Sequence, residues 1–154
     1  MTPAIEAARR ANIRHRVIEY ESAVSRDYGL EAAAAVGVPA EMVYKTLVAK
    51  LDAKRLAVAL VPVSSELDLK ALATLAEAKR AEMATPQEAE RATGYVVGGI
   101  SPLGQRRRLE TYIDSAVTKL TNVYVSAGRR GLEIELTPSD LVACCRARLG
   151  SIAR

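Results

Sequence analysis

The residues best suited to chemistry in this chain begin with a lysine inside an apolar segment. Lys45 interrupts the run Val43–Ala49, which otherwise has the pattern of a strand. An ammonium group at such a position needs water, a counter-ion or an anionic ligand, because an unpaired buried charge is expensive. The alternative is an edge lysine that reaches solvent or prevents strand pairing. The sequence alone leaves both interpretations open.

A glycine-rich stretch is the second candidate. Residues 93–105 contain four of the nine glycines, and the short apolar segment Tyr95–Val97 leads directly into Gly98, Gly99, Ile100, Ser101 and Pro102. Glycine allows a ligand or another backbone to approach closely. The pattern predicts a short strand opening into a rigid loop with uncovered backbone N–H groups. A tight connection in a β-rich domain explains the same residues equally well.

The common catalytic constellations are absent. His15 is the only histidine, and the only cysteines, Cys144 and Cys145, are adjacent, so they cannot build a common zinc site. The loop matches neither a nucleotide-binding loop nor a nucleophile elbow. Ser101 as a nucleophile would need a base, and the only histidine lies between two arginines that favour an exposed edge. Any reaction would therefore depend on positioning, backbone donors and an unusual lysine, which favours a reactive substrate such as an activated ester.

Composition bounds the class of protein. A chain of 154 residues with 49% hydrophobic and 26% charged residues fits one globular domain, residues 1–154. Neither a membrane-spanning run nor a signal peptide is indicated, and the two cysteines favour reduced thiols in the cytoplasm. The net charge of +4 permits an anionic partner without requiring one. Two basic runs are either solvated loops or phosphate contacts: Arg106, Arg107 and Arg108, and Arg129 with Arg130.

The elements that must position these residues follow from patterning. Helices are expected at 2–11, 28–36, 67–76, 85–94 and from Thr137 to about Leu149, with a further helical turn after Pro39 and a short helical or irregular segment at 115–120. Strands are expected at 15–20, 43–49, 56–63, 79–83, 95–97, 111–113, 122–126 and 132–136, and a polar loop at 21–27. The run 56–63 is apolar throughout and predicts a central strand. Hairpins mixed with helices predict an α+β fold with a curved, mixed, mainly antiparallel sheet surrounded by helices.

Several segments resemble the YbaK-type aminoacyl-tRNA deacylases, relatives of the editing insertion of bacterial prolyl-tRNA synthetase. They are spread over nearly the whole chain in the order of the family: 1–4, 43–47, 67–70, 93–95, 98–105, 124–126 and 131–136. The pair formed by Tyr-Lys-Thr-Leu at 44–47 and Gly-Gly-Ile-Ser-Pro-Leu-Gly at 98–104 is specific together, whereas either alone would be weak.

The resemblance implies a site. Lys45 would be the essential lysine, holding the 3′-terminal phosphate and orienting the ester. Gly98, with Gly99, Ile100, Ser101 and Pro102, would hold the aminoacyl end through the backbone. Tyr20, Tyr28 and Thr46 would line the pocket, with Ser126 and Glu133 near it. No metal or organic cofactor is implied.

The implied activity is removal of a wrong amino acid from mischarged tRNA(Pro), in trans, by cleavage of its ester. The closest-looking subgroup acts on Cys-tRNA(Pro), and there the substrate's own thiol is thought to attack the ester. Mischarged tRNA is the implied partner, with prolyl-tRNA synthetase in a ternary complex as a further one, and neither DNA nor a membrane is implied. A deacylase for Ala-, Ser- or Thr-charged tRNA, and a non-catalytic RNA-binding module, remain alternatives.

The chain departs from the family pattern at three positions. Tyr28 stands where Phe is expected, Glu133 where Asp is expected, and Ala127 where Gly is expected in the turn. The first two changes leave the amino-acid preference open, and neither threatens the fold.

Overall fold

The computed structural model describes residues 1–21 and 28–154. The loop expected at 21–27 therefore lies outside the described residues except for Glu21. The helices are α1 (Pro3–Arg10), α2 (Tyr28–Val36), η1 (Ala40–Met42), α3 (Leu69–Leu75), α4 (Pro86–Thr93), η2 (Ser115–Lys119) and α5 (Pro138–Cys145). The strands are β1 (Arg16–Glu19), β2 (Tyr44–Leu51), β3 (Arg55–Pro62), β4 (Ala81–Met83), β5 (Glu110–Asp114), β6 (Val123–Arg129), β7 (Leu132–Leu136) and β8 (Arg148–Gly150).

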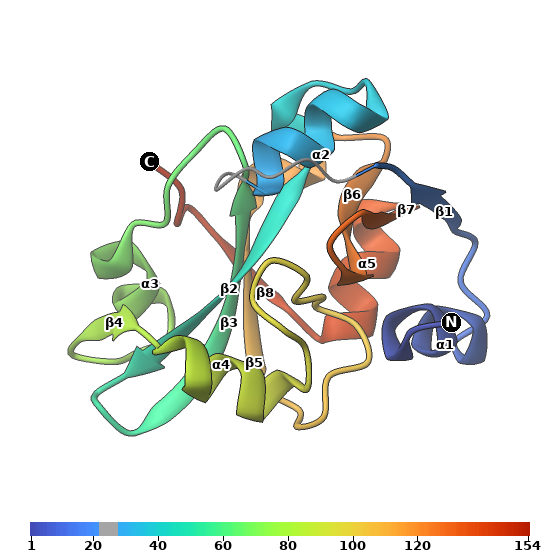
Figure 1. Ribbon diagram of the computed structural model, residues 1–154. Helices are drawn as coiled ribbons and strands as arrows, with labels where there is room; N and C mark the ends of the chain where they lie inside the picture. Colours follow the sequence, from blue (N-terminus) through green and yellow to red (C-terminus); the bar gives the residue numbers. More distant parts are fainter. Residues whose placement is uncertain (22–27) are drawn as a thin grey trace.

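The described strands form two sheets. One has the order β4-β2-β3-β5-β8 and the other the order β1-β7-β6, as Figure 1 shows. The pairs β3–β5 and β5–β8 are parallel and the others antiparallel. An isolated bridge between Val43, just before β2, and Tyr124 of β6 links the two sheets. The α+β fold with mainly antiparallel pairing is therefore confirmed, with the strands divided between two sheets where one curved sheet was expected.

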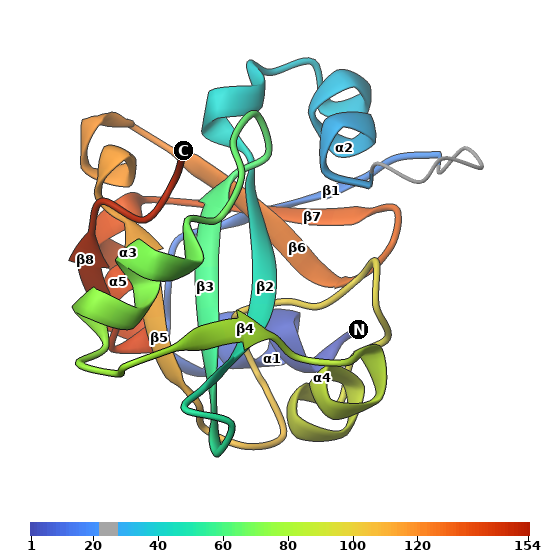
Figure 2. The same cartoon turned by 90° about the vertical axis from the view of Figure 1, so that its left-hand side faces the viewer.

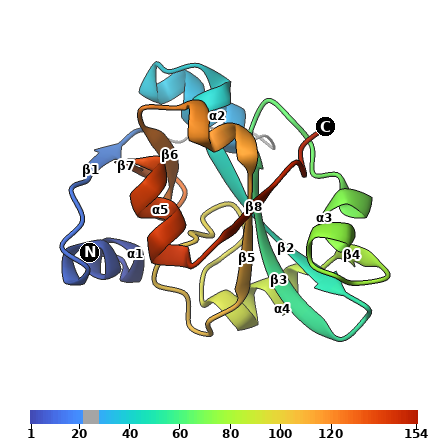
Figure 3. The same cartoon turned by 180° about the vertical axis from the view of Figure 1, so that it is seen from behind.

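Strand β3 is the centre of the larger sheet, as its continuous apolar run predicts. Residues 57–61 are fully buried. Ala57, Ala59 and Val61 face the core that includes α3. Val58 and Leu60 face the larger core, to which α1, α5, β6 and β7 contribute. Figure 3 shows α3 and α5 on opposite sides of these strands.

Helix starts follow the expected capping chemistry. The hydroxyls of Thr2, Thr85 and Thr137 each accept a hydrogen bond from the backbone N–H three residues later, and each threonine precedes a proline in the first turn. Thr85 and Glu88 complete a capping box at α4. In the described part of the chain, no helix has the length and apolarity needed to cross a membrane.

The segment Tyr95–Val97 is a loop, so the strand expected there is wrong. Helix α4 ends at Gly94, which adopts a left-handed conformation with φ of 83°. Buried Tyr95 then donates a hydrogen bond from its hydroxyl to the carbonyl of Leu103, 2.6 Å away. Side-chain anchoring of the loop replaces the strand pairing that three apolar residues suggest.

The last helix is shorter than expected. It ends at Cys145 because Arg146 turns left-handed, with φ of 48°. The chain then forms β8, which pairs parallel with β5 and leads the C-terminus back along the larger sheet. The helix expected up to Leu149 is wrong in its last turn, because residues 148–150 pair with β5 as a strand.

Candidate active site

One pocket, with a volume of about 400 Å³, lies beside the N-terminal half of β2, residues 44–48. Helix α2 lies above this end of the strand and α4 below it in Figure 2. The wall is contributed by β2, α2, α4, the 97–100 loop and the β6–β7 pair. Most of the residues predicted from the sequence to form the substrate site line this pocket, namely Tyr20, Tyr28, Lys45, Thr46, Gly98, Ile100, Ser126 and Glu133.

The backbone of β2 is open to the pocket. The N–H of Val63 donates to the carbonyl of Val43 over 2.8 Å. Hydrogen bonding alternates in an antiparallel pair, so Lys45 also bonds toward β3, whereas Thr46 directs its N–H and C=O to the opposite edge. Strand β4 covers that edge at Ala49–Leu51, and the N–H of Ala84 donates to the carbonyl of Val48. A strand edge is therefore available to a ligand at Thr46.

Lys45 is half-buried in this wall. Across the described residues, no ion pair involves Lys45. A partly buried ammonium without a carboxylate partner can bind an anion at little cost in competing interactions. The position of Lys45 at the pocket is compatible with an anionic ligand.

Thr46 adds a polar group that lacks a partner. Its hydroxyl is buried, and no described residue hydrogen bonds to it. A buried hydroxyl left unpaired costs about 1–3 kcal/mol. A ligand with a complementary polar group would recover that cost.

Gly98 faces the ring of Tyr28. Its φ is +96°, and a Cβ placed on it would lie 3.1 Å from Cε2 of Tyr28. The N–H groups of its neighbours are used within the loop, Val97 donating to Glu90 and Gly99 to the carbonyl of Val96. No described residue accepts from the N–H of Gly98, so this is the loop amide that a ligand could use.

Tyr28 is held in place by Arg130. The guanidinium carbon of Arg130 lies 4.4 Å from the centroid of the Tyr28 ring, which is a cation–π contact. The same guanidinium forms an ion pair with Glu31 over 2.7 Å. Arg130 therefore joins the β6–β7 turn to α2 and shapes the pocket wall through Tyr28.

Glu133 is the buried acid of the pocket. It is 5% exposed, and this burial raises the pKa of its carboxyl from 4.5 to about 8. Burial also raises the pKa of Tyr20, and the nearby Glu133 charge adds to that rise. The Glu133 carboxyl is thus mainly neutral at pH 7 and can donate a hydrogen bond.

Three residues of the loop do not line the pocket, namely Gly99, Ser101 and Pro102. Gly99 packs against the β6–β7 turn, where a Cβ would lie 2.6 Å from the Cα of Arg129, and its carbonyl accepts a 3.1 Å hydrogen bond from Ser126. Ser101 is fully buried, and its hydroxyl accepts from the N–H of Leu103. These groups support the loop from behind.

The other arginines lie elsewhere. Arg129 pairs with Glu19 over 3.0 Å at the exposed β6–β7 turn. Arg107 and Arg108 line a second cavity, and Arg106 packs beside Gly94. In the described ranges no three His, Cys, Asp or Glu side chains form a group that could hold a metal ion.

Helix α4 supplies pocket residues that sequence reasoning missed. Pro86 and Ala89 line the pocket, together with Met83 and Ala84 just before the helix. The capping box predicts where the helix begins. It carries no information on which face meets β2, and small apolar residues give no chemical signal.

Comparison with known proteins identifies the family. Residues 27–144 match the aminoacyl-tRNA editing domain. The chain is 35% identical over 136 residues to EbsC, a candidate Cys-tRNA(Pro)/Cys-tRNA(Cys) deacylase of Enterococcus faecalis (strain ATCC 700802 / V583), covering 87% of this chain and 83% of EbsC.

Solved structures share the fold. A candidate trans-editing enzyme for prolyl tRNA synthetase is 26% identical with a TM-score of 0.84, covering 98% of this chain and 92% of that one. The hypothetical protein APE2540 has a TM-score of 0.89 at 23% identity, covers 99% of both chains, and supports the fold alone. The chain belongs to the family of aminoacyl-tRNA editing domains, and its activity is that of an aminoacyl-tRNA editing deacylase.

Proposed function

We propose that the chain removes cysteine wrongly attached to tRNA(Pro), acting in trans on the mischarged tRNA. The observation that carries this proposal is that Lys45, which has no ion-pair partner among the described residues, and Gly98 line the same 400 Å³ pocket. The name of the Enterococcus relative supports cysteine and tRNA(Pro) as the substrate.

Each proposed role follows from the chemistry of the group. Lys45 holds the phosphate of the 3′-terminal nucleotide, since a charged donor binds phosphate oxygens strongly. The N–H of Gly98 holds the carbonyl oxygen of the ester, where negative charge develops during acyl transfer. Tyr20, Tyr28 and Thr46 surround the aminoacyl side chain. The loop residues Gly99, Ile100, Ser101 and Pro102 fix the position of the Gly98 amide.

The substrate supplies the nucleophile. The cysteine thiolate attacks its own ester carbonyl, so that a C–S bond forms and the C–O bond to the ribose breaks. The ribose oxygen leaves and takes up a proton, which gives a cyclic thioester and free tRNA. This step consumes no cofactor. It fits a pocket in which Ser126, the one serine that lines the wall among residues 1–21 and 28–154, is already bonded to Gly99 and Gly128.

Substitution of Lys45 tests the assignment. Lys45→Ala should lower kcat/KM for Cys-tRNA(Pro) by at least tenfold, and Lys45→Arg should retain more activity because the positive charge remains. Lys119→Ala is the control, because Lys119 is an exposed lysine of η2 that does not line the pocket. Full activity of Lys45→Ala would refute the role of Lys45.

Three other outcomes would redirect the proposal. A preference for Ser- or Thr-tRNA would point to the unpaired Thr46 hydroxyl as a partner for a substrate hydroxyl. Salt-sensitive tRNA binding without deacylation would indicate a non-catalytic RNA-binding module. Cleavage only in the presence of prolyl-tRNA synthetase would make the synthetase part of a ternary complex with the tRNA.

A further inference from the structure

A second cavity, of about 440 Å³, lies at the other end of β2 and is strongly basic. We call it the basic groove. Its wall combines the β2–β3 turn, α4 and the segment before β5. Its cations are Lys50, Lys54, Arg55, Arg107 and Arg108.

The groove carries a surplus of positive charge. Its two acids each hold one cation, since Glu88 pairs with Lys50 and Glu110 pairs with Arg55. The other three cations, Lys54, Arg107 and Arg108, are exposed and pair with no acid among the described residues. Three like charges brought together around one cavity favour a ligand with several negative charges.

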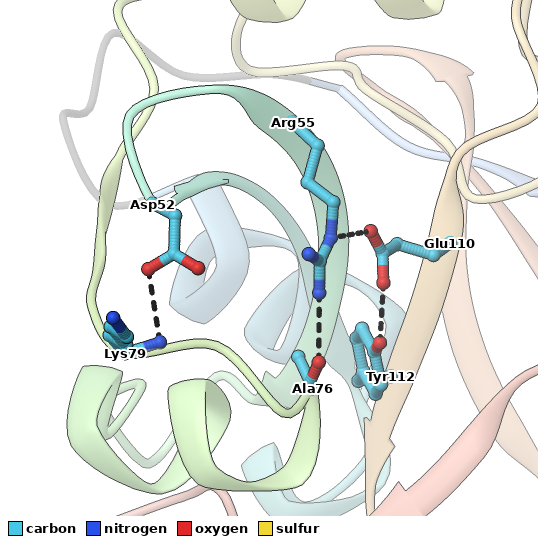
Figure 4. A network of polar contacts seen from close by, with 6 residues as sticks. All are labelled: Asp52, Arg55, Ala76, Lys79, Glu110 and Tyr112. Atoms are coloured by element: carbon cyan, nitrogen blue, oxygen red, sulfur yellow. Dashed lines mark hydrogen bonds and ion pairs between the residues drawn. The ribbon is translucent and has the colours of Figure 1, made fainter.

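The β2–β3 turn is fixed by a polar network, shown in Figure 4. The Arg55 guanidinium donates to Glu110 over 2.6 Å and to the carbonyl of Ala76 over 2.8 Å. Asp52 accepts from the backbone N–H groups of Lys79 and Arg80, both at 3.0 Å. The turn that presents Lys54 is therefore anchored to β5, to the end of α3 and to the segment before β4.

The arginine segment is fixed as well. The backbone N–H of Arg106 donates to Thr93 over 2.9 Å, and that of Arg107 to Ala92 over 3.1 Å. Both acceptors belong to the last turn of α4. The cations of the groove thus project from three anchored segments, which reduces the ordering cost of binding a ligand.

The groove continues the line of the pocket along one face of β2. Thr46 and Val48 line the pocket, and Lys50, on the same face, lines the groove. Helix α4 spans both, with Ala89 at the pocket and Glu88 at the groove. Lys50 follows Thr46 by four positions along the strand, which corresponds to about 13 Å. A stacked nucleic-acid strand advances about 3.4 Å per phosphate, so this separation corresponds to roughly four nucleotides.

We propose that the basic groove binds the sugar–phosphate backbone of the tRNA acceptor end, a few nucleotides before the 3′ terminus that enters the pocket. The inference rests on the proposed function for the identity of the RNA. The proposal assigns different roles to two groups of basic residues. Lys54, Arg107 and Arg108 contact phosphate, whereas Arg129 and Arg130 serve the β6–β7 turn.

The test is tRNA binding as a function of salt, measured by fluorescence anisotropy with uncharged tRNA(Pro) and therefore independent of catalysis. Removing two phosphate contacts in Arg107→Gln/Arg108→Gln should make the slope of log K against log salt shallower by about 1.4–1.8. Lys54→Gln alone should change the slope by roughly half as much. The control, Arg9→Gln/Arg10→Gln, removes the same charge from the exposed end of α1, and its slope should stay unchanged.

The outcomes separate the groove from the activity. We call Arg107→Gln/Arg108→Gln the groove variant and Arg9→Gln/Arg10→Gln the α1 variant. Equal salt slopes for the two would overturn the proposal that the groove binds tRNA, even if the wild-type chain cleaves Cys-tRNA(Pro). A shallower slope in the groove variant alone would support the groove, even if no aminoacyl-tRNA is cleaved. If cleavage occurs, the groove variant should raise KM for aminoacyl-tRNA about tenfold with little change in kcat. An aminoacyl-oligonucleotide made of only the last three nucleotides would not reach the groove, so the groove variant should cleave it as fast as the wild-type chain. An equal loss of activity on this oligonucleotide and on full-length aminoacyl-tRNA would contradict the role of the groove.

Discussion

At the scale of single residues, the glycine loop acts through backbone geometry. Gly98 combines a positive φ with a position where an added Cβ would meet the Tyr28 ring, and Arg130 forms a cation–π contact with the same ring. Ser101, the one loop residue with a nucleophilic side chain, is turned into the interior and bonded to Leu103. The loop therefore offers the backbone amide of Gly98 to a ligand, whereas the hydroxyl of Ser101 stabilises the loop.

Two substitutions separate these roles. Gly98→Ala should lower kcat/KM for Cys-tRNA(Pro) at least tenfold, because the added methyl group strains the backbone and displaces Tyr28. Ser101→Ala should cost about 1–3 kcal/mol in the free energy of unfolding while leaving kcat/KM within about threefold. Steady-state kinetics and urea unfolding measure both effects. Loss of activity in a stably folded Ser101→Ala would instead make this serine the nucleophile.

Glu133 and Glu135 show what the sequence can and cannot predict about single residues. Alternation in the 132–136 run places both acids on one face of the strand. Their surroundings differ, which the sequence could not show. Partial burial opposes ionisation of Glu135, but hydrogen bonds from Tyr124 and Arg16 outweigh it and lower its pKa. Glu133 has only burial, which raises its pKa.

Stability should therefore depend on pH through Glu133. The folded-state pKa of about 8 exceeds the ordinary value of 4.5, so the folded state retains a proton that the unfolded chain has lost. The free energy of unfolding should fall between about pH 4.5 and pH 8, by at most roughly 1.4 kcal/mol per pH unit, and level off above. Urea unfolding across this range should show a smaller decline for Glu133→Gln. An identical decline in both proteins would assign it to other groups.

At the scale of elements, Asp114 joins the C-terminal segment to the larger sheet. One carboxylate oxygen accepts from the N–H groups of Ile152 and Ala153, at 3.0 and 2.9 Å, and the other accepts from Ala116. Asp114 is buried at the end of β5. One side chain thus satisfies three backbone donors from two segments, which fixes β8 beside β5.

Asp114→Ala should destabilise the chain by about 2–4 kcal/mol, since three backbone donors lose their acceptor in a largely buried region. Asp114→Asn should cost less because its carbonyl oxygen can still accept. Chemical denaturation of the two variants gives the comparison. Similar small losses for both would mean that apolar packing of Ile152, and not this carboxylate, holds the segment.

Elements with local signals were predictable. Thr-Pro pairs gave the starts of three helices, and the apolar run 56–63 gave the central strand. Strand β8 had no such signal, because its pairing with β5 is a long-range contact between parallel strands. The 95–97 segment carries the composition of a strand, but Tyr95 finds its partner in Leu103.

At the scale of the whole molecule, β2 connects the two sites. Its first half supplies Lys45 and Thr46 to the pocket, and its second half supplies Lys50 to the basic groove. From the sequence, the pocket follows through Lys45 and the glycine loop. The basic run marks Arg107 and Arg108 as candidate phosphate contacts, but the groove does not follow from the sequence, because its cations come from three separated segments that only the fold brings together.

The most direct test of the central claim is a single panel of tRNA(Pro) charged with Cys, Ala, Ser or Thr and incubated with the wild-type chain. The proposal predicts rapid loss of cysteine and near-background loss of serine, because the serine hydroxyl is a far weaker nucleophile than a thiolate. A matched panel with Lys45→Ala should remain charged throughout. Equal rates for Cys- and Ser-tRNA(Pro), or no cleavage of Cys-tRNA(Pro), would contradict the proposal.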